Sequence, residues 1–77
     1  MDKKIFAQRL KSQRELRGFT QKQLATALKI TERGYQCYEA LSGFKPPSST
    51  LLFAIAEALD VSIDYLFGRT ANPKVYK

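Results

Sequence analysis

The chain has 77 residues, which is enough for one domain with a modest hydrophobic core. Its composition is that of a globular protein and excludes a disordered or fibrous chain. Thirteen Lys and Arg residues against seven Asp and Glu give a net charge of +6, and the whole excess lies before residue 46. This asymmetry favours a polyanion such as nucleic acid as the partner, although a solvated, charged helix surface would produce it too.

Several kinds of site are absent from the sequence. Cys37 is the only cysteine and there is no histidine, so neither an intramolecular disulfide nor a Cys/His metal site is expected. No nucleophile with a neighbouring base and no glycine-rich phosphate loop is present, so we expect no enzyme activity, cofactor or small-molecule ligand. No apolar run approaches the roughly 18–20 residues that span a bilayer, so we expect a cytoplasmic protein without membrane contact.

Residues 4–17 have the pattern of an amphipathic helix. Ile5, Phe6 and Leu10 recur at helical spacing, and Gly18 is a typical stop signal. Arg14 continues the apolar line and should therefore point inward. Since an unpaired buried charge is unfavourable, we expect it to pair with Glu39.

The central segment, residues 20–39, predicts two short helices joined by a tight turn. Thr20 and Gln23 have the spacing of a capping box, after which apolar residues share one face: Leu24, Ala25 and Leu28. Thr31 can cap a second helix that buries Tyr35 and Tyr38. Two or three residues around Lys29 separate the helices, which is typical of a DNA-reading helix-turn-helix.

The remainder of the chain predicts two more helices. After a loop containing Gly43, Pro46 and Pro47, Ser48 or Ser49 can cap a helix, and Ser62 can open a shorter one that Gly68 ends. The apolar residues of these two helices are Leu52, Ile55, Ala56, Leu59, Ile63, Leu66 and Phe67. We therefore predict an all-α, compact five-helix bundle over residues 1–68, with a polar tail over residues 69–77.

Three motifs follow one another along this chain: GFTQKQLATAL, a capped helix ending in Tyr38-Glu39, and Pro47-Ser48 followed by LLFAIAEALDVSIDYLFG. With them, residues 5–68 resemble the Xre/Cro family of phage repressors and bacterial regulators. The first motif fits the family pattern G-[LF]-[ST]-Q-x-x-L-A. The resemblance implies the phage-repressor type of helical DNA-binding domain.

The resemblance also implies roles for individual residues. Gln21 corresponds to the first residue of the second helix, which fixes the protein on a phosphate and packs against the recognition helix. Thr31 corresponds to a cap that can also touch a phosphate. Arg14 and Glu39 correspond to a buried ion pair. The positions that face base edges are Glu32, Arg33, Gln36 and Cys37.

Three of these base-facing residues have a chemically definable role. Arg33 could pair with guanine, and Gln36 could pair with adenine, contact a phosphate or simply lie on the surface. Glu32 could accept from cytosine or simply act as favourable charge at a helix N-terminus. Cys37 is interpreted as a small apolar residue rather than a redox sensor. Further phosphate contacts are expected from Lys11, Lys22 and Lys45.

Three features depart from the family pattern: the residue between the two central helices, the loop from Glu39 to Pro47, which is longer than in common members, and the acidic Glu32 that opens the recognition helix. The residue between the two central helices is usually Gly and here is Lys29, so the chain either accepts a left-handed residue or turns differently.

These observations predict a sequence-specific, double-stranded-DNA-binding transcription regulator, a repressor, that binds a palindromic operator as a homodimer. The expected dimer interface comprises Phe53, Tyr65, Val75 and Tyr76. The alternative is a protein-interaction module of the same fold, such as an antitoxin or an adaptor, with weak or no DNA binding.

Overall fold

Five α-helices make up most of the described residues, 3–40 and 47–73, of the computed structural model. They are α1 (Lys3–Leu16), α2 (Gln21–Ala27), α3 (Glu32–Glu39), α4 (Ser49–Leu59) and α5 (Ile63–Leu66). No strand occurs within these two ranges. The predicted all-α, five-helix bundle is therefore confirmed, and the first helix begins and ends one residue earlier than expected.

Hydroxyl side chains define where four of the helices begin. In each case the side-chain oxygen accepts from the backbone N–H three residues later, and at α2 Gln23 completes the capping box by accepting from the N–H of Thr20. The caps are Thr20, Thr31, Ser48 and Ser62. Of the two serines considered for α4, Ser48 is the cap.

Left-handed residues define where four helices end. Gly18 and Gly68 both have φ near +79°, and Lys29 and Asp60 have φ of 61° and 54°. At each end, the N–H of the left-handed residue and that of the next residue return to carbonyls of the last turn, which is the Schellman arrangement. After α2, for example, Lys29 donates to the Thr26 carbonyl at 3.1 Å and Ile30 donates to the Ala25 carbonyl at 3.0 Å. Lys29 thus accepts the left-handed conformation that the family gives to glycine.

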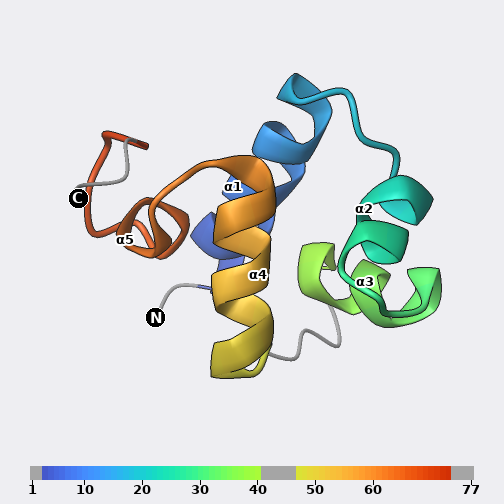
Figure 1. The fold of residues 1–77 in the computed structure, drawn as a ribbon. Helices are drawn as coiled ribbons and strands as arrows, with labels where there is room; N and C mark the ends of the chain where they lie inside the picture. Colours follow the sequence, from blue (N-terminus) through green and yellow to red (C-terminus); the bar gives the residue numbers. More distant parts are fainter. Residues whose placement is uncertain (1–2, 41–46, 74–77) are drawn as a thin grey trace.

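The core lies between α1 and the other helices (Figure 1). In that view α2 and α3 lie on one side of α1, α5 lies on the other, and α4 crosses in front. Phe6 of α1 stacks on Phe67 at 5.3 Å between ring centroids, and Phe19, which lies between α1 and α2 in the chain, packs against the core. The fully buried side chains are Phe6, Leu10, Leu24, Tyr35, Ile55, Leu59, Val61 and Leu66. The helix pair is therefore held by one continuous core.

Arg9 fastens the C-terminal segment to α1. Its Nη1 donates to the carbonyls of Tyr65 at 2.6 Å and Thr70 at 2.7 Å, and its guanidinium carbon lies 4.3 Å from the centroid of the Tyr65 ring. The Ser62 N–H also donates to the Pro73 carbonyl at 2.9 Å. Part of the predicted polar tail, residues 69–73, is thus hydrogen-bonded to the bundle, and residues 74–77 lie outside the described residues.

Candidate nucleic-acid interface

The helix α3 has one buried and one exposed face. Tyr35 is fully buried and Tyr38 is half-buried, and their rings meet edge to face at 6.4 Å. At the N-terminus, the Gly34 N–H donates to the Thr31 hydroxyl at 3.0 Å, and a Cβ at position 34 would lie only 3.1 Å from that oxygen. The inner face and the cap together fix how α3 sits in the domain.

The outer face of α3 carries the side chains that the sequence assigned to base contacts. Glu32, Arg33 and Gln36 are exposed. Cys37 is half-buried, and its thiol lies 3.6 Å from the Arg33 carbonyl, so it contributes less to this face than expected. The outer face is therefore mainly polar, with Arg33 as its only basic side chain.

Arg14 and Glu39 form the buried ion pair expected from the sequence. Arg14 Nε donates to Glu39 Oε2 at 2.7 Å and its Nη2 donates to Oε1 at 3.2 Å, while Nη1 donates to the Phe19 carbonyl at 2.8 Å. The two side chains are only 9% and 4% exposed. The hydrogen bond to Glu39 raises the pKa of Arg14 above its ordinary value although burial opposes the rise. This pair joins α1 to the end of α3.

Tyr35 is a second residue that donates to the same carboxylate. Its hydroxyl donates to Glu39 Oε2, and burial, followed by this hydrogen bond, raises the pKa of Tyr35 far above its ordinary value. The phenol is therefore held in its neutral, donating form.

Gln21 connects this buried group to the exposed face. Its Nε2 donates to Glu39 Oε1 at 3.2 Å, and its Oε1 accepts from Gln36 Nε2 at 3.4 Å. The first residue of α2 thus lies against α3, where the resemblance placed it. The sequence did not indicate its two specific partners, because neither is near it along the chain.

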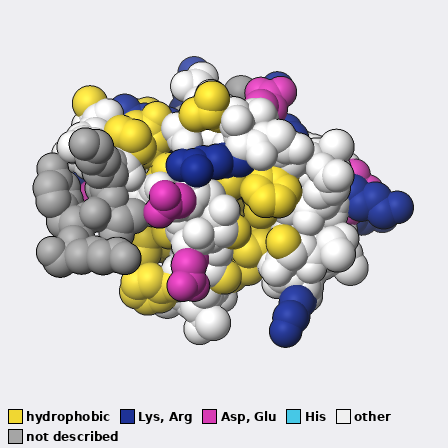
Figure 2. Space-filling view, turned by 45° about the horizontal axis from the view of Figure 1, so that its top comes forward, with side chains coloured by type: hydrophobic (Ala, Val, Ile, Leu, Met, Phe, Trp, Pro, Cys, Tyr) yellow, Lys and Arg dark blue, Asp and Glu magenta, His cyan; other side chains and the backbone are white. Residues whose placement is uncertain are grey.

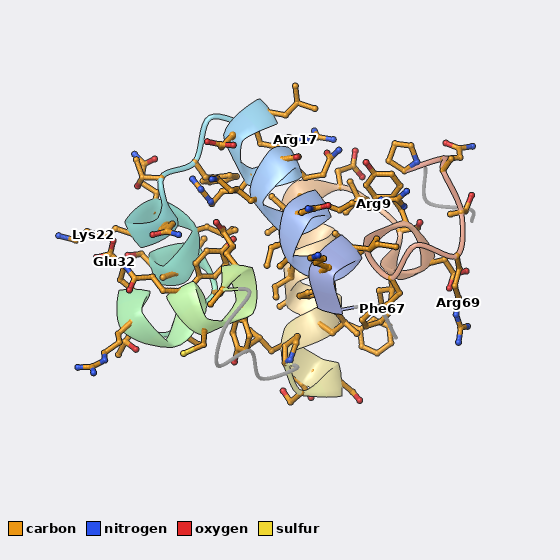
Figure 3. All side chains as sticks on the ribbon, turned by 180° about the vertical axis from the view of Figure 1, so that it is seen from behind. Arg9, Arg17, Lys22, Glu32, Phe67 and Arg69 are labelled. Carbon is orange, nitrogen blue, oxygen red and sulfur yellow. The ribbon has the colours of Figure 1, made fainter. Side chains whose placement is uncertain are left out.

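The predicted phosphate contacts lie on more than one element. Lys22 is exposed on α2, and Figure 3 shows it projecting from the same part of the molecule as Glu32, far from Arg69. Lys11 is exposed on α1, and Lys45 lies outside the described residues. In Figure 2, separate Lys and Arg side chains project from the edge of the molecule on the side of α2 and α3, with uncharged surface between them. Attraction of a polyanion to this side of the domain would therefore come from separate Lys and Arg side chains rather than from one continuous basic patch.

The residues predicted for a dimer interface differ in exposure. Phe53 on α4 is 65% exposed, whereas Tyr65 is half-buried because it packs on the core and beneath Arg9. Val75 and Tyr76 lie outside the described residues. Leu16, which the sequence did not single out, is 75% exposed at the end of α1.

No group of three or more potential metal ligands is found among residues 3–40 and 47–73. None of the helices in this part of the chain is both long and apolar enough to cross a bilayer.

Comparison with known proteins identifies the family. A helix-turn-helix family model matches residues 10–66, which include α2, α3 and most of the bundle. The chain belongs to the Xre/Cro helix-turn-helix family. The resemblance inferred from the three sequence motifs is thereby confirmed.

Three curated relatives carry regulator names. The chain is 37% identical over 73 residues to YqaE and 39% identical over 69 residues to YobD, both uncharacterized HTH-type transcriptional regulators of Bacillus subtilis. It is 41% identical over 65 residues to RstR, the cryptic phage CTXphi transcriptional repressor of Vibrio cholerae. These alignments cover 95%, 90% and 84% of this chain but only 61%, 60% and 56% of the relatives. The chain therefore spans about three-fifths of their length, and no solved structure matches it significantly.

Proposed function

We propose that this Xre/Cro-family domain is a sequence-specific repressor that inserts the exposed face of α3 into the major groove of double-stranded DNA. The observation that carries the proposal is the rigid, capped helix α3, whose inner face is buried while Glu32, Arg33 and Gln36 remain exposed. A DNA regulator acts where the genome lies, so the proposal includes a cytoplasmic location.

Base reading is assigned to the outer face of α3. Arg33 donates to guanine O6 and N7, and Gln36 contacts a base further along the groove. Glu32 accepts from cytosine N4 where it reaches a base, and its charge is also favourable beside the N–H groups at the N-terminus of α3. Cys37 lies at the edge of this face and supplies a small apolar contact.

Phosphate contacts are assigned to groups other than the base-reading side chains of α3. Gln21, Thr31 and Lys22 lie at or near the helix pair, while Lys11 on α1 and Lys45 add positive charge. Such contacts position the protein on the duplex without reading sequence. Because α3 has only one basic residue, these flanking groups supply most of the salt-dependent attraction.

A homodimer would double the number of base pairs read. One recognition helix reads too few base pairs for high specificity, and two copies related by a two-fold axis would place their helices about 34–36 Å apart, one turn of DNA. The exposed Phe53 on α4 supports the C-terminal half as the interface. We assign Tyr65, Val75 and Tyr76 to the same interface. Sedimentation of the protein on a selected duplex tests this: a strict monomer on DNA would remove the dimer.

The central test is DNA binding across a salt series. Sequences are selected from a random duplex pool, and the affinity for the best sequence is measured by mobility shift. We expect log K to fall linearly with log salt, with a slope of about 0.9 for each phosphate neutralised. An absent or salt-insensitive shift would instead support a protein-interaction module.

A matched pair of arginine variants separates base reading from general charge. Arg33→Ala should reduce discrimination at one base pair of each half-site by about 1–3 kcal/mol. Arg69→Ala removes the same charge from the far side of the domain (Figure 3) and should leave discrimination unchanged. Equal effects of the two variants would contradict the assignment of α3 to the groove.

A further inference from the structure

Lys29, in the turn between α2 and α3, is a residue that its own backbone conformation disfavours. The described residues with a left-handed backbone are Gly18, Lys29, Asp60 and Gly68. Glycine has no Cβ, and aspartate is several-fold enriched in this conformation because its short polar side chain can bond locally. Lysine has neither property, and Lys29 has φ of 61°. It is therefore the one strained residue type among the four.

Contacts on both sides hold the backbone of this turn in place. Leu28 and Ile30 pack against the core. The Lys29 N–H donates to the Thr26 carbonyl at 3.1 Å, and the Ile30 N–H donates to the Ala25 carbonyl at 3.0 Å. Glycine at position 29 could keep all of these contacts without the strain, because none of them involves the lysine side chain. The turn itself therefore does not explain the lysine.

The Lys29 side chain makes no polar contact in the part of the chain that the structure describes. It is exposed, and within residues 3–40 and 47–73 it takes part in neither an ion pair nor a hydrogen bond. Glu32, the nearest carboxylate along the chain, is exposed as well and is not paired with it. What lysine adds to the turn, relative to glycine, is a positive charge on a flexible four-carbon stem.

We propose that Lys29 contacts a DNA phosphate beside the N-terminus of α3, and that this contact accounts for a lysine at a strained position. Lys29 lies two positions before Thr31, the cap of α3 to which a phosphate contact is already assigned. Lysine binds phosphate as a point charge, so an exposed, flexible side chain is sufficient. Strained backbone that its surroundings hold in place is typical of binding sites. The inference rests on the proposed function, because it assumes that α3 enters the groove.

The experiment measures two properties that the proposal predicts to move in opposite directions. Lys29→Gly should raise the urea midpoint, because it removes the strain, and should weaken binding to the selected duplex. The slope of log K against log salt should become shallower by about 0.9, the value for one phosphate. When the salt is lowered from about 200 to about 50 mM, the affinity deficit of this variant should therefore grow about 3.5-fold.

Two further variants separate charge from backbone conformation. Lys29→Gln keeps the strain and removes the charge, so it should lose the same slope as Lys29→Gly while its urea midpoint stays near that of the unaltered protein. Lys29→Arg keeps both the strain and the charge and should retain the slope. All three variants should keep the base preferences of the unaltered protein, because phosphate contacts position a protein without reading sequence.

Two matched controls lie elsewhere in the domain. Asp60→Gly also relieves a left-handed residue, at the end of α4, so it should raise the urea midpoint slightly and leave the slope unchanged. Arg69→Ala also removes one positive charge, but from the part of the molecule far from Lys22 and Glu32 (Figure 3), and should leave the slope unchanged.

The failures are distinguishable. Unaltered protein that binds no duplex, or binds without salt dependence, overturns the proposed function together with this inference. If the unaltered protein binds with the expected salt dependence and both Lys29→Gly and Lys29→Gln keep its slope, only the role of Lys29 is refuted. A slope that falls in Lys29→Gly but not in Lys29→Gln refutes it as well, since the effect would then come from the backbone and not from the charge.

Discussion

Replacing Glu39 with alanine is the most direct test of what holds α3 in place. In the folded protein this carboxylate accepts from Arg14, Tyr35 and Gln21 while its own side chain is only 4% exposed. Without it, Arg14 keeps one acceptor, the Phe19 carbonyl at 2.8 Å, and its remaining donors face a site that is 9% exposed. The variant therefore leaves a largely buried positive charge without its counter-charge.

The expected loss in the free energy of unfolding is about 3–5 kcal/mol, the range for removing one partner of a buried ion pair. The orphaned Tyr35 hydroxyl contributes to this loss, whereas water reaching the half-buried Gln21 amide moderates it. Since a domain of this size is stable by only about 5–15 kcal/mol, the effect should be large in urea unfolding followed by circular dichroism. Removing both charges, as in Arg14→Met with Glu39→Ala, should destabilise less than the sum of the single changes.

The control is an ion pair that is exposed to solvent rather than buried. Arg69 lies 4.0 Å from Asp64, and the two side chains are 77% and 66% exposed, so Arg69→Ala should change the urea midpoint little. If Glu39→Ala lost less than about 1 kcal/mol, as exposed pairs do, the reasoning from burial would be refuted.

Three further predictions concern backbone conformation and pH. Lys29→Gly should stabilise the protein by about 0.5–1 kcal/mol because the left-handed conformation strains a residue with a Cβ, and Asp60→Gly should gain less because aspartate tolerates that conformation better. Gly68→Ala should lower the urea midpoint more than Gly18→Ala: both have φ of +79°, but only at position 68 would the new Cβ lie 3.0 Å from an isoleucine side chain of α1. The raised pKa of Tyr35 means that its contribution to stability is complete below the unfolded-state pKa of about 10 and is lost as the pH rises above it; Tyr35→Phe should reduce this alkaline loss. An unchanged pH dependence in Tyr35→Phe would contradict the assigned burial of the phenol.

Local sequence signals were sufficient for the helices and for one tertiary contact. A Ser or Thr whose hydroxyl can accept from the backbone N–H three residues later marks the start of a helix without any tertiary contact, so the starts of four helices could be predicted. The sequence did not decide whether Ser48 or Ser49 caps α4. The pairing of Arg14 with Glu39 was also predictable, because an arginine on an inward line needs a carboxylate and few are available. Gly18 and Gly68 were recognised as helix ends since glycine favours the left-handed conformation.

The interactions of Arg9 could not be predicted in this way. Its acceptors lie 56 and 61 positions away along the chain, and they are backbone carbonyls, which carry no sequence signal. The same contact explains why Tyr65 is half-buried. Phe53, which was also predicted for the dimer interface, is exposed. When an apolar side chain lies outside the regular apolar stripe of its helix, its exposure depends on which neighbouring segment covers it.

The sequence by itself determined the helix pair, its family and the residues of its outer face, because spacing and capping act over a few positions. The tertiary structure decided the conformation of Lys29: Leu28 and Ile30 on either side of it pack against the core, and Lys29 between them is left-handed, with φ of 61°. It also decided that Gln21 lies between Glu39 and Gln36, since hydrogen bonds among three side chains from two helices exist only once those helices are packed.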